Sequence, residues 1–565
     1  MTSVMALYLL DECKLQRGER ALLVFFPGLQ FMLSLIACFK AGVIAVPVFP
    51  PDPRKQKKDL HHFISIQSSS GAKVVLSHTL YNIAKKMSAI KNIFSGSSGS
   101  WPELHWISVD GVISKAKSAK NTPSLEALPA ISVTDIAFLQ YTSGSTSEPK
   151  GVMISHGNLA HNEMLIATEL KTSTDTVCVS WLPQYHDMGL IGSYLGLLQC
   201  GGSGFYLSPI SFLKNPVQWI KSMSDFGATH TQAPNFAYAL VTRKYLELSE
   251  ESRKALQLNL STLQHMINAA EPVDDDALNM FVETFSPFGL PPNVIFPTYG
   301  LAESTVFVCS GGSQRLEVVR ESLEGRRVEV IAKNDGALVK ANNQGESDSL
   351  LGDSEEVKAT ENGESKTVVV VGCGYPSRGE DVTVIIVDPE SRKVLEEDDI
   401  GEIWVNSPSK AMGYWEKPDL SEAEFFASPE SYHNDDKFLR TGDLGFMHNT
   451  ELFICGRLKD LIIVRGSNHY PQDIERTVEQ ACPQLRAGCS AAFSVKNSNG
   501  PKNAKNAKHS VKSNAHTEGV MYVAEVKQDV SPSDYDQIIA NARAVVTADH
   551  GVSLMLVALL KVRNA

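Results

Sequence analysis

Residues 141–151 have a composition that suits the binding of phosphate groups. They read Tyr-Thr-Ser-Gly-Ser-Thr-Ser-Glu-Pro-Lys-Gly and follow an apolar run at 136–140 that predicts a strand. Small hydroxylated residues around Gly144 let backbone N–H and hydroxyl groups converge on phosphate oxygens, and Lys150 adds a positive charge. The spacing is not that of a Walker loop, because no Gly-Lys-Ser/Thr follows four residues after a glycine. The segment therefore predicts a phosphate-binding loop of another type, with a Ser/Gly loop that binds nothing as the alternative.

A second segment, at 296–305, reads Phe-Pro-Thr-Tyr-Gly-Leu-Ala-Glu-Ser-Thr and stands at the end of a predicted strand. Loops at the carboxyl ends of strands are where open α/β sheets bind ligands. Tyr299 can stack on a purine, Gly300 adds flexibility, and Glu303 can bind Mg²⁺, which proteins often hold with one or two carboxylates plus substrate phosphates. Taken alone, a buried tyrosine and a carboxylate at a helix N-terminus are the simpler interpretation.

A third group combines glycine-flanked charges near the C-terminal part of the chain. Asp443 lies in Arg-Thr-Gly-Asp-Leu-Gly at 440–445, where an aspartate in a turn can accept both hydroxyls of a ribose. Arg457 and Asp460 belong to Gly-Arg-Leu-Lys-Asp at 456–460, which suggests a charged junction between two lobes. By composition alone, both segments are ordinary turns.

The elements that must position these residues follow an α/β pattern. The uncharged run at 21–39 is nearly long enough to span a bilayer, but Pro27 and Gly28 interrupt it. It predicts a strand at 21–26, a helix at 29–41 and a strand at 43–48, and we expect neither a membrane span nor a signal peptide. Further strands are predicted at 74–76, 136–140, 177–181 and 294–297, alternating with helical patterns.

Two polar stretches and a change of pattern suggest the domain organisation. Residues 334–366 are predicted to form an exposed insertion, and strands at 367–371, 382–387 and 401–405 predict a β-rich subdomain. The stretch at 496–519 holds five lysines without interleaved aromatic residues, so a solvated loop is favoured over a nucleic-acid-binding patch. We predict a large lobe at 1–456, made of mixed and parallel sheets flanked by helices, and a small α+β lobe at 457–565.

Composition narrows the classes of partner. The 565 residues carry a formal net charge of −12, which disfavours binding to nucleic acid and to anionic membranes. Nine scattered cysteines, odd in number and never spaced as Cys-x-x-Cys, predict reduced thiols without a zinc site and a cytoplasmic protein.

In this order, the motifs resemble those of the adenylate-forming (AMP-binding) superfamily. The resemblance runs from about residue 22 to 562 and rests on the phosphate loop, Tyr-Gly-x-x-Glu, Thr-Gly-Asp and Gly-Arg-x-Lys-Asp. Three segments are most similar to the fatty acyl-AMP ligase branch: Trp-Leu-Pro-Gln-Tyr-His-Asp-Met-Gly-Leu at 181–190, Asn-Ala-Ala-Glu-Pro at 268–272, and 458–466 with the following Asn-His-Tyr-Pro at 468–471.

The resemblance implies a role for each matching residue. Tyr299 would stack on adenine with Gly300 beside it, Glu303 would bind Mg²⁺, and Asp443 would bind the ribose with help from Arg457. Asp460 would be the hinge of the small lobe, His186 would lie near the reacting carboxylate unless it is a core imidazole, and Ala270 would line the nucleotide pocket. The mobile triphosphate loop would comprise Thr142, Ser143, Gly144, Ser145, Thr146 and Lys150.

The resemblance implies ATP- and Mg²⁺-dependent activation of a fatty acid, whose tail would occupy an apolar tunnel from the 188–198 and 226–238 regions. Transfer to an acyl-carrier protein is favoured, and the alternative acceptor is CoA, as in a fatty acyl-CoA synthetase. The insertion falls where this branch carries a segment held to hinder CoA use, but it is more polar and longer than expected, which weakens that argument.

Both ends of the sequence also depart from the family pattern. The opening region before Leu22 is shorter than in the family. The family's terminal Gly-Lys segment, expected just after Ala565, is missing, so the small lobe is predicted to be truncated. That leaves a catalytically weak nucleotide or acyl sensor as an alternative of another class.

Overall fold

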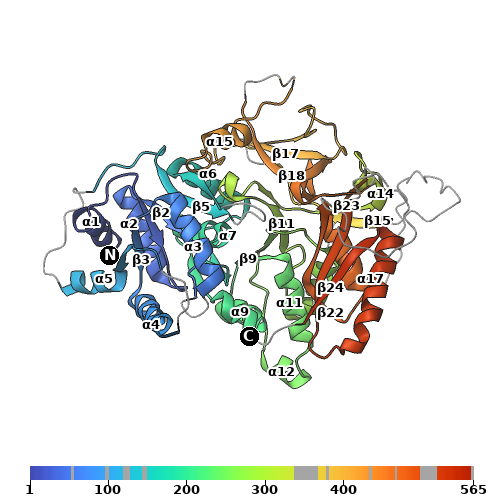
Figure 1. The fold of residues 1–565 in the computed structure, drawn as a ribbon, viewed down its shortest axis with the longest axis horizontal. Helices are drawn as coiled ribbons and strands as arrows, with labels where there is room; N and C mark the ends of the chain where they lie inside the picture. The colour runs from blue at the N-terminus through green and yellow to red at the C-terminus, as the bar shows by residue number, and fades with distance from the viewer. Residues whose placement is uncertain are drawn as a thin grey trace, which may run out of the picture.

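The computed structural model consists of two large sheets with helices, a group of antiparallel sheets and a small lobe (Figure 1). It describes residues 1–52, 56–95, 101–118, 128–142, 149–335, 367–376, 381–430, 432, 436–464, 467–496 and 518–561. The predicted loop residues Ser143, Gly144, Ser145 and Thr146 lie outside this set, as do nearly all of the polar insertion and most of the 496–519 stretch. The predicted α/β fold class is confirmed.

The first sheet has the strand order β4-β3-β1-β2-β5-β6. It contains the predicted βαβ unit, with parallel β1 (Arg20–Leu23) and β2 (Ile44–Pro47) joined by α2 (Leu29–Ala41). All residues of β2 are buried, as expected for a parallel strand covered on both faces. The other elements of this part are α1 (Thr2–Asp11), α3 (Gln56–Ser70), β3 (Val74–Ser77), α4 (Thr79–Ser95), β4 (His105–Ser108), α5 (Val109–Ser118), β5 (Ile136–Thr142) and the antiparallel β6 (Lys150–Ser155).

The second sheet has the order β12-β11-β10-β9-β7-β8 and is parallel except for β12. Large aromatic side chains such as Trp219, Tyr238 and Phe281 are fully buried beside it and fix its helices. Its strands are β7 (Val177–Ser180), β8 (Ser203–Tyr206), β9 (His230–Pro234), β10 (His265–Ala269), β11 (Ile295–Tyr299) and β12 (Cys309–Ser310). Its helices are α6 (His156–Glu169), α7 (Asp187–Gly189), η2 (Leu190–Leu195), α8 (Gly196–Cys200), α9 (Pro209–Lys214), α10 (Val217–Phe226), α11 (Asn235–Leu246), α12 (Glu250–Ala255), α13 (Asp275–Phe285), η3 (Ser286–Phe288) and η4 (Ala302–Ser304).

Two antiparallel sheets form the predicted β-rich part. In the first, β13 (Gln314–Val319) pairs with β14 (Val330–Asp335) and β15 (Thr367–Val371), so the polar insertion connects the two outer strands. Asn334, predicted to begin the insertion, instead lies in β14 opposite Arg315. The second sheet contains β16 (Thr383–Val387), β17 (Gly401–Asn406), β18 (Leu439–His448) and β19 (Glu451–Arg457), with α14 (Arg320–Glu324) and α15 (Pro418–Phe425) nearby in sequence.

The predicted turn around Asp443 is wrong. Residues 440–445 lie within β18, which is paired with both β17 and β19. Gly442 has a φ of 71°, and the register of β18 against β19 shifts between Leu444 and Gly445. A glycine in the left-handed region thus bends the strand locally without ending it.

The small lobe has a hydrophobic core of its own among the described residues, drawn from positions between Ile462 and Val557. Its elements are η6 (Leu458–Asp460), β20 (Ile462–Val464), β21 (Ser467–His469), α16 (Pro471–Ala481), β22 (Leu485–Lys496), β23 (Glu518–Val526), η7 (Pro532–Asp534), α17 (Tyr535–His550) and β24 (Leu554–Lys561). It is the red part of Figure 1, beside α11 and α14. The separate core is consistent with the predicted boundary at 456/457, which stays a prediction. Over the described residues, no helix combines the length and hydrophobicity needed to cross a bilayer.

Candidate active site

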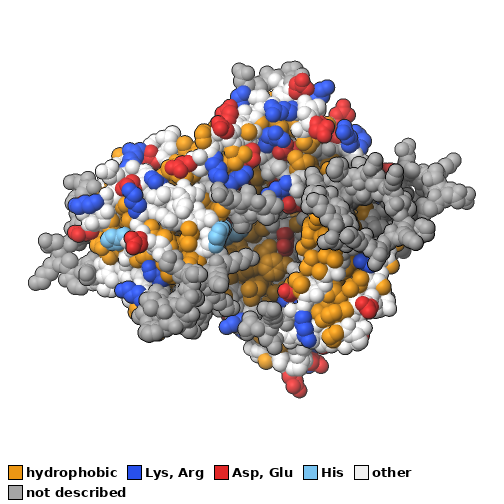
Figure 2. Space-filling view, viewed as in Figure 1, with side chains coloured by type: hydrophobic (Ala, Val, Ile, Leu, Met, Phe, Trp, Pro, Cys, Tyr) orange, Lys and Arg blue, Asp and Glu red, His pale blue; other side chains and the backbone are white. Residues whose placement is uncertain are grey.

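A cavity of about 760 Å³ lies at the carboxyl ends of strands from both large sheets. Figure 2 shows a hollow in the same part of the molecule, between the first sheet and the small lobe, with hydrophobic side chains in its floor. The predicted residues in the cavity wall are Thr142, Lys150, His186, Ala270, Gly300, Glu303, Asp443 and Arg457. The fold therefore brings together residues that are up to about 300 positions apart in the sequence.

Glu303 stands in the short helix η4, directly after β11, and its carboxylate faces this cavity. Its backbone oxygen accepts a hydrogen bond from the Ala411 N–H at 2.9 Å, which ties η4 to the β-rich part. Burial raises the pKa of Glu303, so the carboxylate favours a cationic partner when it is ionised. Gly300 is required by close packing, because a Cβ atom there would lie 1.7 Å from the Val306 carbonyl oxygen.

Two residues that sequence reasoning missed, Tyr414 and Glu424, complete this acidic corner. The Tyr414 hydroxyl lies 3.0 Å from Glu303 Oε1 and 2.8 Å from Glu424 Oε2. The Tyr414 hydroxyl has one proton and can donate it to only one of these oxygens at a time, so the two carboxylates share a single hydrogen-bond donor. The Glu303 carboxylate fits a hard divalent cation such as Mg²⁺, which takes one or two carboxylates together with phosphate oxygens.

Lys150 faces the same corner from β6. Its Nζ lies 3.4 Å from Glu424 Oε1 and 4.5 Å from the centre of the Tyr414 ring. If the ion pair between Lys150 and Glu424 breaks, the Lys150 ammonium group could reach phosphate groups in the cavity. Glu424 therefore competes with an anionic ligand for Lys150.

This competition gives a testable expectation for Glu424→Gln. Partly exposed ion pairs contribute about 0.2–1 kcal/mol, so release of Lys150 is expected to lower the KM for ATP by up to about fivefold. Steady-state kinetics at saturating Mg²⁺ measures this change. Glu422→Gln, an exposed carboxylate on the same helix, is the matched control. A rise in the KM for ATP specific to Glu424→Gln would contradict the competition.

Asp443 is buried at the bend in β18. The Tyr299 hydroxyl donates to its Oδ2 at 2.7 Å, and Arg457 Nε lies 3.3 Å from its Oδ1. Burial raises the pKa of Asp443, against the opposing effect of Arg457. The Tyr299 ring packs in the core with Val308 and Cys309, while its neighbours Thr298 and Gly300 line the cavity.

Glu402 on β17, also missed by sequence reasoning, fixes the backbone before Asp443. Its Oε2 accepts from Arg440 Nε and Nη2 at 3.0 and 2.7 Å and from Trp404 Nε1 at 3.0 Å. Its Oε1 accepts from the Gly442 N–H at 3.2 Å. Charge-assisted bonds of this kind hold a buried carboxylate firmly and so position the strand bend.

His186 presents 56% of its side-chain surface and lines the cavity, so it is not a core imidazole. Its Nδ1 lies 2.6 Å from Asp187 Oδ1, and this carboxylate raises the pKa of His186 above its ordinary value. Burial alone would raise the pKa of Asp187. The interactions with His186 and with the Met188 N–H outweigh this effect of burial and hold the pKa of Asp187 below its ordinary value. Asp187 therefore orients the ring, which the sequence analysis did not anticipate.

Apolar side chains also line the cavity. Met188, Gly192 and the polar Gln232 come from the predicted tunnel regions. Ile166 of helix α6 and Leu170, which directly follows that helix, were not predicted. Ala270, which also lines the cavity, has a φ of 73°, an uncommon conformation for a residue with a side chain. Asp460 ends η6 beside the cavity residues Leu458 and Lys459 and is partly buried, and its hinge role stays a prediction.

Comparison with known proteins identifies the family. Residues 2–347 match the family model described as AMP-binding enzyme. The chain is 35% identical over 556 residues to the medium-chain-fatty-acid–[acyl-carrier-protein] ligase JamA of Moorena producens, which covers 97% of this chain and 83% of that relative. The chain belongs to the AMP-binding enzyme family. The resemblance inferred from the motifs is thus confirmed.

This AMP-binding enzyme is also similar to one further relative and to one solved structure. It is 31% identical to the long-chain-fatty-acid–AMP ligase FadD32 of Mycolicibacterium smegmatis, over 95% of this chain and 81% of that protein. Among solved structures, a fatty acyl-adenylate ligase from L. pneumophila in complex with acyl adenylate and pyrophosphate has a TM-score of 0.67 and 30% identity, covering 100% of this chain and 86% of that one.

Proposed function

We propose that this AMP-binding enzyme is an acyl-adenylate-forming ligase that activates a fatty acid with ATP, releases pyrophosphate and passes the acyl group to a carrier-protein thiol. The observation that carries the proposal is the cavity, which is lined both by the charged residues Lys150, Glu303 and Asp443 and by apolar residues such as Ile166, Leu170 and Met188. Such a cavity suits a polar nucleotide joined to a hydrocarbon tail. Two relatives, a fatty-acid–[acyl-carrier-protein] ligase and a fatty-acid–AMP ligase, support the same reaction by their activities.

In the proposed reaction, an oxygen of the fatty-acid carboxylate attacks the α-phosphorus of ATP while pyrophosphate leaves from the opposite side. The protein aligns the two reactants and neutralises the growing negative charge. Lys150 supplies one positive charge, His186 orients the attacking carboxylate, and Asp443 holds the ribose hydroxyls. Thr142, Ser143, Gly144, Ser145 and Thr146 hold the phosphates, and Tyr299, Gly300, Ala270 and Arg457 form the nucleoside site. Mg²⁺, when bound by Glu303 and phosphate oxygens, supplies further charge neutralisation.

The hydrocarbon tail of the substrate lies against the apolar residues of the cavity wall. Each buried CH₂ group adds about 0.8 kcal/mol to binding, so fatty acids are favoured over short acids until the space is filled. The small lobe at 457–565 turns about Asp460 between adenylation and thiol transfer, which are the two half-reactions of the proposed cycle.

The decisive experiment measures pyrophosphate release by the purified chain with ATP, Mg²⁺ and fatty acids of increasing length. We expect release that depends on the fatty acid, together with acyl adenylate detected by mass spectrometry. Addition of a phosphopantetheine-loaded carrier protein or of CoA then identifies the acceptor, with acyl transfer to the carrier protein expected. If ATP and fatty acid bind but no pyrophosphate is released, the chain is a sensor and the proposal fails.

A further inference from the structure

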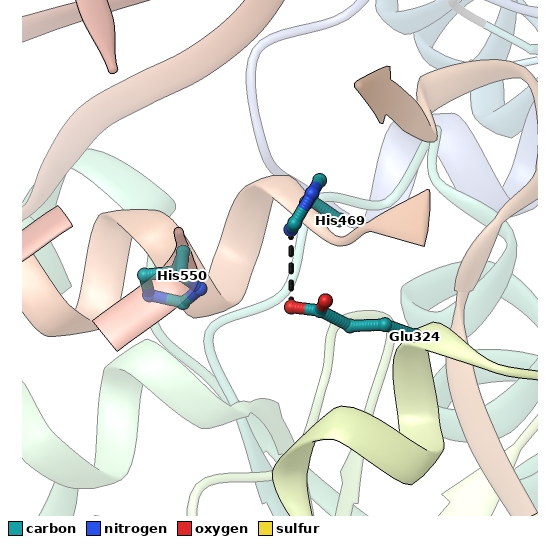
Figure 3. A group of neighbouring side chains, drawn as sticks. All are labelled: Glu324, His469 and His550. Atoms are coloured by element: carbon teal, nitrogen blue, oxygen red, sulfur yellow. Dashed lines mark hydrogen bonds and ion pairs between the residues drawn. The ribbon is translucent and has the colours of Figure 1, made fainter. Parts of the chain in front are cut away.

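Three potential metal ligands from three separate elements converge where the small lobe meets the large one (Figure 3). They are Glu324 at the end of α14, His469 at the end of β21 and His550 at the end of α17. One ligand atom of each lies within 4.8 Å of those of the other two, and His469 Nδ1 is 3.0 Å from Glu324 Oε1. Both histidines are buried, at 4% and 6% exposure. This junction is separate from the cavity that binds the proposed substrates.

The distances suit a zinc site after a small movement. Tetrahedral Zn²⁺ bonds imidazole nitrogen and carboxylate oxygen at about 2.0–2.2 Å, which places its ligand atoms roughly 3.4 Å apart. At 3.0 Å, Glu324 Oε1 and His469 Nδ1 lie slightly closer than this, and a zinc ion bound to both would replace the proton of their hydrogen bond. His550 must approach by roughly 1.4 Å at most. Two imidazoles and a carboxylate are a ligand set that zinc takes in proteins, with water in the fourth position.

The surroundings of the cluster carry both signs of charge. Arg320 Nη1 lies 3.4 Å from His550 Nε2, and the Thr477 hydroxyl lies 2.8 Å from the same nitrogen. Asp473 interacts electrostatically with Arg320, which partly balances the guanidinium charge. Arg320 and Thr477 contact the ring of His550 and so hold it near Glu324. If zinc binds His550 Nε2, both residues must lose their contacts with that nitrogen.

We propose that Glu324, His469 and His550 bind Zn²⁺ and that the bound ion fastens the small lobe to the large lobe in the arrangement seen here. Glu324 belongs to the predicted large lobe, whereas both histidines belong to the predicted small lobe. A metal ion bonded to all three therefore resists any rotation that separates α14 from β21. Zinc acts at this junction as an inhibitory clamp on lobe movement.

The test is zinc binding by the full chain without a purification tag, in millimolar Mg²⁺ so that the predicted Glu303 site is filled. Competition with a chromophoric chelator is expected to give one Zn²⁺ per chain, and Co²⁺ in its place is expected to show the strong visible absorption of four-coordinate cobalt. Loss of a residue that only orients a metal ligand weakens metal binding by about 10–100-fold. Glu324→Gln and His550→Gln each remove a ligand, so each should weaken zinc binding by more than this.

The matched control is His448→Gln. His448 Nδ1 lies 2.7 Å from Asp398 Oδ1, so it forms a similar histidine–carboxylate pair away from the lobe junction. This variant should bind zinc as the unmodified chain does. Hydrogen exchange at 467–477 should slow on addition of zinc in the unmodified chain and in His448→Gln, but not in Glu324→Gln.

Three results would overturn the proposal. The first is absence of stoichiometric zinc binding, and the second is unchanged affinity in His550→Gln. The third is zinc binding that persists in Glu324→Gln, because the ion would then not connect the lobes. Glu324 has 20% of its side chain exposed, so its isosteric replacement tests the proposal even if a buried histidine variant fails to fold.

Discussion

Replacing Glu303 with glutamine is expected to lower the rate of pyrophosphate release by about 10²–10³-fold at low Mg²⁺. Glutamine keeps an oxygen that can accept from Tyr414 but loses the negative charge that holds the cation. Because the lost interaction is with Mg²⁺, a higher Mg²⁺ concentration should recover part of the rate. Initial rates over a Mg²⁺ titration, with total ATP held constant, measure this recovery.

Asp443→Ala provides the contrasting case. It removes the acceptor of the Tyr299 hydroxyl and the partner of Arg457, and with them the proposed contact with the ribose. The rate should fall through a higher KM for ATP, and added Mg²⁺ should not restore it. If Mg²⁺ rescues both variants or neither, the separate roles assigned to Glu303 and Asp443 are wrong.

The sequence was sufficient to predict the scaffold that carries these residues. The helix at 29–41 was predicted with the bounds that α2 has, because Pro27 and Gly28 precede it and Gly42, with a φ of 68°, ends it. Apolar runs without polar alternation marked the buried parallel strands β1, β2 and β3. The bounds are less exact for the strands: β1 ends at Leu23, although the apolar run that predicts it continues to Phe26.

The missed residues depend on contacts between distant parts of the chain. Tyr414 meets Glu303 across 111 positions, and Lys150 meets Glu424 across 274. Neither Tyr414 nor Glu424 belongs to a segment with unusual composition. Only the backbone hydrogen bonds of residues 411–415 with β6 and η4, just before α15, could reveal their place. The error at Asp443 has a different cause, because a glycine beside an aspartate predicts a turn as readily as a bend within a strand.

Glu163 is a buried acid outside the candidate site whose titration should affect stability. It lies in α6 with 5% of its surface exposed, and neither carboxylate oxygen has a hydrogen-bond partner within the described part of the chain. Burial raises its pKa to about 8, from 4.5 for an exposed glutamate. The folded chain therefore keeps a proton at neutral pH that the unfolded chain has released.

The sign of the pH dependence follows from this proton. Between about pH 4.5 and pH 8 the native state binds more protons at Glu163 than the unfolded state, so the free energy of unfolding falls as pH rises. The contribution of the protonated group is complete below pH 4.5 and is lost once the pH passes 8. Its steepest slope is about 1.4 kcal/mol per pH unit.

Glu163→Met, which keeps the approximate size of the side chain and cannot ionise, should remove this dependence. Its melting temperature relative to the unmodified chain is expected to be higher at pH 9 than at pH 5, measured for the transition of the large lobe. Glu251→Met, at an exposed position in α12, is the control for loss of a single carboxylate. Parallel stability curves for Glu163→Met and the unmodified chain across this range would mean that Glu163 is already ionised when folded, with a cation or water supplying the partner that its two oxygens lack.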